Sequence, residues 1–111
     1  MDSVTLALIP GEIFPELVSG QGLTEEDPEA LTSIASRHGA ETLLILGLCN
    51  DELGYIVPPS NFLINEELPY IETVTDATGE NHYEETNSVG KGTAAIIAAA
   101  LEKALEQMPK P

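Results

Sequence analysis

Two short apolar runs flank an amphipathic segment in the first half of the chain. Residues 4–9 read VTLALI and end at a Pro–Gly pair, and residues 42–48 read TLLILGL. Short, almost wholly apolar runs of this kind, bounded by turn residues, are typical of strands buried on both faces of a parallel sheet. We therefore predict two core strands whose sheet needs cover on both sides.

The segment between these runs predicts a helix. Asp27, Pro28 and Glu29 follow one another in the order of an N-cap, a first helical proline and a favourable first-turn acid. His38 and Gly39 are suited to the helix end. Apolar residues repeat at helical spacing between these ends: Ala30, Leu31, Ile34 and Ala35. Strand, helix and strand in this order predict a right-handed βαβ unit with parallel strands.

The second half of the chain changes character. Residues 54–81 are rich in Pro, Asn and Glu, which predicts a long polar loop with one short strand at residues 70–75. Residues 93–107 are rich in Ala and predict an amphipathic helix. Its expected apolar face comprises Ile97, Leu101, Ala104, Leu105 and Met108. The predicted fold class is α/β, with a βαβ unit, parallel core strands, a long polar loop and a C-terminal amphipathic helix, as a single domain over residues 1–111.

Composition narrows the possible partners. Nineteen acidic residues against four basic ones give a net charge of −15. Nucleic acid is not an expected partner, because phosphate contacts need Lys and Arg. Cys49 is the only cysteine, which excludes an internal disulfide and a zinc cage built from cysteines. No membrane span and no signal peptide are predicted, so we expect a soluble chain of unassigned compartment.

Polar groups follow both predicted strands. Glu12 comes after the first strand, and the segment from Asn50 to Tyr55 comes after the second. Adjacent parallel strands bring such groups together at their carboxyl ends, where ligands bind in α/β sheets. A carboxylate and a phenol at this place can bind a cation or transfer protons. The alternative is that Glu12 caps a turn and Tyr55 packs its ring, and spacing alone favours this alternative.

Four segments together resemble a known family. IPGE stands at residues 9–12 and GLCN at residues 47–50, with Tyr55 five residues after Asn50. HYEE at residues 82–85 is followed by Ser88 and the closing helix. In this order and at these spacings, the segments resemble the carboxy-terminal part of the catalytic domain of neutral ceramidases and their ceramidase-like relatives.

The resemblance implies a zinc site that is shared with residues further upstream. In that family the zinc ligands are upstream histidines, the Glu of the PGE turn and the Tyr after the Asn, which correspond to Glu12 and Tyr55. The enzymes hydrolyse the amide of N-acylated sphingoid bases. By position, Asn50 would brace the turn that aims Tyr55. The residues implied to line or support the pocket are Tyr83, Glu84 and Ser88.

The chain departs from the family in its histidines. His38 and His82 are the only two, and neither matches a ligand of the family. His38 is interpreted as a surface imidazole at a helix end. The implied catalytic residues are therefore absent from this chain. We expect it alone to bind zinc weakly and to hydrolyse no N-acyl sphingoid substrate.

The sequence supports two functional hypotheses. The first is that residues 1–111 are a fragment of a zinc-dependent amide hydrolase acting on an amide-linked lipid, and that a missing N-terminal part completes the site. The second is a non-catalytic binding or oligomerisation module that retains the scaffold. Because two helices cannot cover both faces of the predicted strands, we also expect a homo-oligomer.

Overall fold

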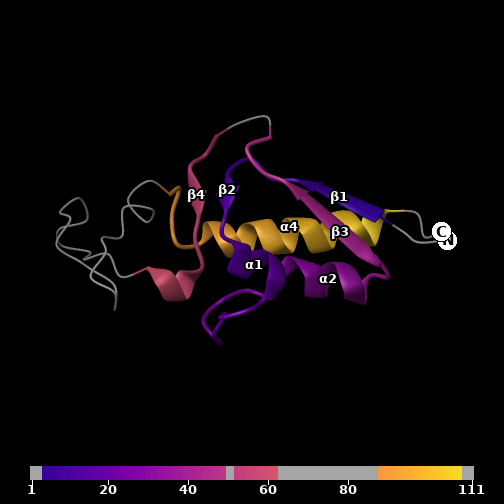
Figure 1. The fold of residues 1–111 in the computed structure, drawn as a ribbon, viewed down its shortest axis with the longest axis horizontal. Helices are drawn as coiled ribbons and strands as arrows, with labels where there is room; N and C mark the ends of the chain where they lie inside the picture. The colour runs from indigo at the N-terminus through magenta and orange to yellow at the C-terminus, as the bar shows by residue number, and fades with distance from the viewer. Residues whose placement is uncertain (1–3, 50–51, 63–87, 109–111) are drawn as a thin grey trace.

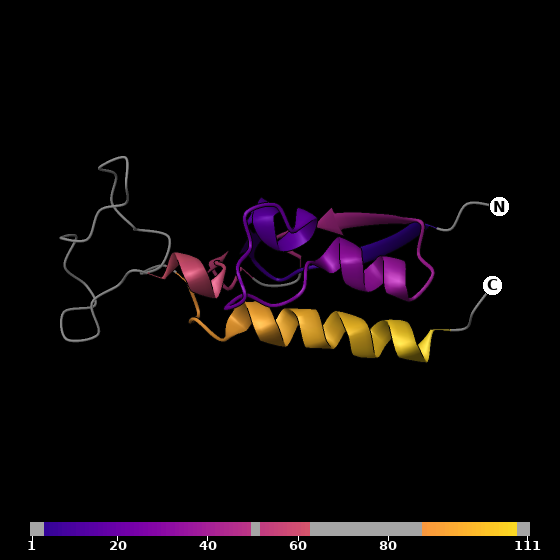
Figure 2. The same ribbon diagram turned by 90° about the horizontal axis from the view of Figure 1, so that it is seen from below.

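The computed structural model describes residues 4–49, 52–62 and 88–108 of the 111 in the chain (Figures 1 and 2). Asn50, Tyr83, Glu84 and the predicted strand at residues 70–75 lie outside the described residues. The elements follow in this order: β1 (Val4–Leu8), β2 (Glu12–Ile13), α1 (Pro15–Ser19), α2 (Leu31–Arg37), β3 (Thr42–Leu46), β4 (Tyr55–Ile56), a 3-10 helix η1 (Pro59–Asn61) and α4 (Thr93–Gln107).

The strands form two parallel pairs, β1 with β3 and β2 with β4. β1 and β3 are in register from Val4 opposite Thr42 to Leu8 opposite Leu46. The α2 helix lies between them in the chain, so the predicted βαβ unit with parallel strands is confirmed. The mixture of helices with parallel strands confirms the α/β class.

Only one face of the β1–β3 pair is covered by the described residues. Ala7 and Ile9 are buried in the core, whereas Leu6, opposite Leu44, is 53% exposed. Successive side chains of a strand point to opposite faces, so one face is buried and the other is open. The exposed aliphatic side chains of the open face are Val4, Leu6, Leu8, Leu44 and Leu46. The described residues thus bury one of the two faces for which these apolar strands are suited, as expected of a chain with too few helices to cover both.

The helices gather on the covered face. Figure 2 shows α2 and α4 on the same side of β1 and β3. α2 packs against α1, β3 and α4, so it is the central helix of this layer. Its predicted apolar face is confirmed, because Ala30, Leu31, Ile34 and Ala35 are all buried.

The start of α2 differs from the prediction. The helix begins at Leu31 with Ala30 as its N-cap residue, whereas the pattern placed the N-cap at Asp27. The side chain of Asp27 instead accepts hydrogen bonds from Ser60, which lies in η1 (2.8 Å from the backbone nitrogen and 2.6 Å from Oγ). The acceptor oxygens are thus used in a tertiary contact rather than in a cap. The predicted helix end at His38 and Gly39 is confirmed, with Gly39 at φ 85°.

The helix predicted at residues 93–107 coincides with the observed α4. The face that α4 buries is rotated about the helix axis relative to the predicted apolar face. Ala94, Ala98 and Leu105 are buried, with Ile97 and Leu101 packed against the same core. Ala104 and Met108 are exposed, contrary to the expected apolar face. A helix this rich in Ala presents apolar side chains all round, so packing against α2 decides which of them are buried.

Three described segments were not recognised as structure in the sequence, and the two-residue strand β2 is one of them. α1 is a five-residue helix that buries Leu17. β4 and the start of η1 lie in the predicted polar loop, yet four successive residues there, Ile56 to Pro59, are buried. The beginning of that loop is therefore part of the core.

Candidate functional site

The short β2–β4 pair places the two predicted metal ligands side by side. Glu12 and Tyr55 are register partners in this parallel pair, and Tyr55 also forms an isolated parallel bridge with Ser88. Figure 1 shows β2 and β4 running together beyond the ends of β1 and β3. We call Glu12, Tyr55 and Ser88 the rim cluster. It lies on the carboxyl side of both core strands, where ligands bind in parallel sheets.

Close backbone contacts hold the two strands of the rim together. The backbone nitrogen of Glu12 donates to the Gly54 oxygen at 3.0 Å, and that of Phe14 donates to the Ile56 oxygen at 3.0 Å. A Cβ at Gly11 would lie 2.6 Å from the Gly54 oxygen, so only glycine allows this approach. The turn residues of the PGE segment therefore fix the position of Glu12 against β4.

Side chains alternate between the two faces of β2 and β4, and this alternation decides which of them face the core. Ile56 is fully buried, and its register partner Ile13 packs against the core. Glu12 and Tyr55 lie on the opposite face, with Glu12 exposed and Tyr55 half-buried. The rings of Phe14 and Tyr55 meet edge-on, with centroids 6.4 Å apart. This contact restricts the orientation of the Tyr55 ring.

The structure thus brings together three of the predicted site residues. Glu12 and Tyr55 share one edge of the molecule as expected, and Ser88, predicted to support the site, is bridged to Tyr55. Their roles as ligands and support stay predictions. Asn50, Tyr83 and Glu84 lie outside the described residues.

The chemistry of the rim cluster fits half of a metal site. A carboxylate is a common oxygen ligand of zinc, whereas a phenol is an unusual one that the cation must first deprotonate. A catalytic zinc usually has three protein ligands and one open position, so Glu12 and Tyr55 alone are not sufficient. Imidazoles from elsewhere would be needed to complete the set.

A second group of metal-binding side chains lies between α2 and α4. His38, Glu102 and Glu106 each offer a ligand atom, and these atoms all lie within 4.8 Å of one another. The interpretation of His38 as a surface imidazole is wrong, because its side chain is only 19% exposed and its Nε2 atom is buried. The sequence signal that could have found the group is the spacing of Glu102 and Glu106 by one helical turn.

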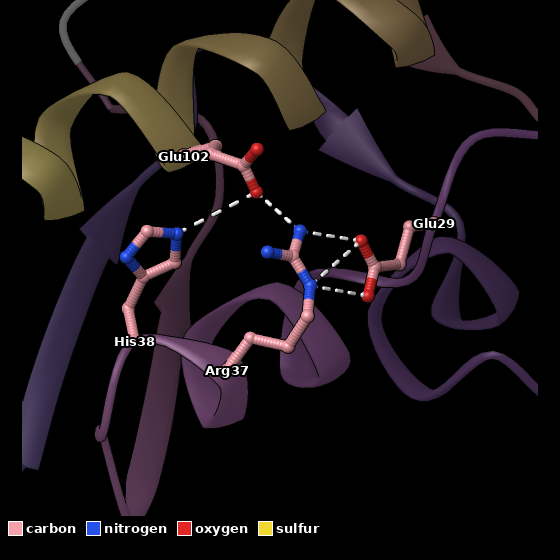
Figure 3. Close-up of polar contacts among 4 residues, drawn as sticks. All are labelled: Glu29, Arg37, His38 and Glu102. Atoms are coloured by element: carbon pink, nitrogen blue, oxygen red, sulfur yellow. Dashed lines mark hydrogen bonds and ion pairs between the residues drawn. The ribbon is translucent and has the colours of Figure 1, made fainter.

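Arg37 organises the carboxylates beside this group (Figure 3). Its guanidinium pairs with Glu29 at 2.7 Å and also with Glu102. Hydrogen bonds to Glu29 and then to Glu102 raise the pKa of Arg37, and the Arg37 hydrogen bond lowers the pKa of Glu29. The α2–α4 contact therefore includes a fixed chain of charges around Glu102.

Other features of the described residues add no further candidate for the site. A shallow hollow of about 260 Å³ between α2 and β3 is lined by Thr32, Ser36 and Leu43 among others, and its lining includes no residue of the rim cluster. Among the described helices, none is long and apolar enough to cross a membrane.

Comparison with known proteins found no matching family model, no similar curated protein and no similar solved structure. The resemblance to neutral ceramidases therefore stays a hypothesis that depends on the sequence segments.

Proposed function

We propose that this chain is the carboxy-terminal part of a zinc-dependent amide hydrolase resembling neutral ceramidase. Glu12 and Tyr55 supply two of its oxygen ligands, and the imidazole ligands come from a missing N-terminal part of the protein. The observation that carries the proposal is the register pairing of Glu12 with Tyr55 at the carboxyl side of the sheet. Residues 43 positions apart in the sequence, one in each of two separate segments, meet there.

The residues of the rim have distinct tasks in this proposal. Glu12 binds through its carboxylate, and Tyr55 binds as a phenolate, which needs a cation to become deprotonated. The edge-on ring of Phe14 orients Tyr55, and Ser88 supports the backbone of β4. A zinc ion bound there would lower the pKa of a water molecule and polarise the carbonyl of an amide-linked lipid.

The test uses the complete translated product of the gene that encodes this chain. We expect zinc-dependent release of fatty acid from an N-acyl sphingoid base. Glu12→Gln and Tyr55→Phe should each reduce kcat/KM by more than the roughly 10- to 100-fold that is typical of residues that only orient a metal ligand. Glu25→Gln, in the exposed loop before α2, is the matched control and should retain full activity.

A complete product that releases no fatty acid with zinc present would refute the proposal. So would an active product whose rate is unaffected by both rim substitutions. Either result would favour the second candidate function.

The second candidate is a non-catalytic oligomerisation module, and one observation favours it. The open face of β1–β3 carries five aliphatic side chains that are each 49% to 61% exposed. Contiguous apolar patches of this kind usually mark a protein contact. A stable complex formed by an inactive gene product would support this function.

A further inference from the structure

We propose that His38, Glu102 and Glu106 form a binding site for a divalent transition-metal ion of the zinc class, separate from the rim cluster. The site would join the C-terminal end of α2 to the last turns of α4. It differs from the proposed hydrolase site in its residues and in its place in the fold, so it does not depend on that proposal. Zinc bound here would replace the expectation from the sequence that this chain alone binds zinc weakly.

The geometry of the three side chains fits such an ion. Glu102 and Glu106 are four residues apart on α4 and so lie on one side of the helix, facing the residue that caps α2, His38. Ligand atoms around tetrahedral zinc are about 3.4 Å apart, as follows from bond lengths of about 2.1 Å. The observed atoms lie within 4.8 Å of one another. Rotamer changes of Glu106, which is exposed, can close the remaining gap.

The state of the imidazole points to a ligand. The Nε2 atom of His38 is shut off from solvent and has no hydrogen-bond partner among the described residues. The nearest carboxylate oxygen, on Glu102, is 3.6 Å away, which is too far for a hydrogen bond. Figure 3 shows Nε2 directed toward this carboxylate. Since buried polar atoms are usually satisfied, a cation between the two groups would supply the missing partner.

The neighbouring charges favour a cation and orient one ligand. Arg37 and His38 both face the same oxygen of Glu102, Oε2, so a bound cation would share this carboxylate with the guanidinium (Figure 3). Glu29 pairs with the same guanidinium and offsets its charge. Three carboxylates, from Glu29, Glu102 and Glu106, therefore accompany one guanidinium in this part of the α2–α4 contact. The ion pair fixes Glu102, as hydrogen-bond partners beyond the ligands do in known metal sites.

The experiment measures the thermal unfolding of this chain with zinc chloride and with magnesium chloride. Zinc should raise Tm by on the order of 10 °C at concentrations about 100-fold above Kd, because it binds the folded state. Magnesium, which prefers oxygen ligands in octahedral geometry, should raise it far less. His38→Gln and Glu106→Gln should each abolish most of the zinc shift. Glu106 takes no part in the Arg37 ion pairs, so Glu106→Gln should leave the metal-free Tm unchanged.

Three control variants show whether the zinc shift comes from this site. Glu25→Gln tests non-specific binding to surface carboxylates, and Glu12→Gln tests the rim cluster. His82→Gln tests the other histidine of the sequence. All three should keep the full zinc shift. The proposal fails if zinc leaves Tm unchanged, if His38→Gln keeps the shift, or if one of the control variants removes it. The activity assay for the rim residues is a separate measurement, so the two proposals can fail separately.

Discussion

A few polar side chains connect segments that are distant in the sequence. Asp27 accepts hydrogen bonds from Thr24 in its own loop and from Ser60 in η1. Burial acts to raise the pKa of Asp27, but the hydrogen bonds from Ser60 and Thr24 outweigh it and lower the pKa below its ordinary value of 3.8. The ionised carboxylate is therefore the form that the folded chain stabilises.

Replacing Asp27 should alter both stability and its dependence on pH. Because the pKa is lower in the folded chain, this stabilisation is fully present above the pKa of the unfolded chain and is lost as pH falls through the folded value. Asp27→Asn should reduce the free energy of unfolding by about 1 kcal/mol at neutral pH, through weaker hydrogen bonds. It should also flatten the acid side of the stability profile. Urea unfolding between about pH 3 and pH 7 measures both effects, with Glu25→Gln as the control. Equal acid sensitivity in the wild type and Asp27→Asn would contradict this role of the carboxylate.

At the scale of elements, the junction between the core strands and the β2–β4 pair decides the geometry of the rim. β1 reaches β2 across three residues, whereas β3 reaches β4 across eight, from Gly47 to Gly54. This longer segment lies against the PGE turn, where the Leu48 nitrogen donates to the Gly11 oxygen at 3.1 Å and the Leu53 nitrogen donates to the Pro10 oxygen at 2.9 Å. The close packing of this segment against the PGE turn brings Glu12 into register with Tyr55.

A side chain at Gly11 should disturb this junction. Gly11→Ala would place Cβ 2.6 Å from the Gly54 oxygen, and the backbone there has no freedom to move as a flexible side chain would. We expect a loss of about 1–3 kcal/mol in the free energy of unfolding, as for other overpacking substitutions. Gly92→Ala is the control, since nothing lies within 4 Å of its added Cβ. The control should lose less than about 1 kcal/mol, through its N-cap position. Chemical denaturation measures both, and equal losses would show that the contact is not decisive.

At the scale of the whole molecule, apolar surface is distributed unevenly. The covered face of β1–β3 packs on the helices, and the open face presents Leu6 beside Leu44 and Leu8 beside Leu46. Burying a few hundred Å² of this surface would contribute several kcal/mol at about 25 cal/mol per Å². The net charge of −15 opposes association, but repulsion between solvated charges is screened within about 8 Å at physiological salt.

We therefore expect the isolated chain to self-associate through the open face of β1–β3. Sedimentation at moderate salt should show a dimer or a larger species for the wild type. Leu44→Lys should give a monomer, because it places a charge at the centre of this face. Ile96→Lys is the matched control, since Ile96 is an aliphatic residue on α4 that is 68% exposed. A wild-type monomer at all concentrations would rule out this association, and a monomer from Ile96→Lys alone would move the contact to α4.

The sequence predicted what depends on local pattern and short-range connection. The strands at β1 and β3, their parallel pairing and the bounds of α4 follow from apolar runs, helical spacing and the handedness of a βαβ unit. The proximity of Glu12 and Tyr55 also followed, because parallel strands share one carboxyl edge. The start of α2 was not predicted correctly, because Asp27 was equally suited to a helix cap and to the tertiary contact with Ser60.

Only the tertiary structure decided which side chains are covered and which distant groups meet. The sequence predicted that two helices leave part of the strands uncovered, but an apolar run does not reveal which of its faces the helices cover. The stripe that α4 buries was also undetermined, because an Ala-rich helix can pack through several faces. His38 and Glu106 are 68 residues apart in the sequence, and only the packing of α2 on α4 places an imidazole beside two carboxylates. Local pattern sets the elements, whereas long-range packing sets the chemistry between them.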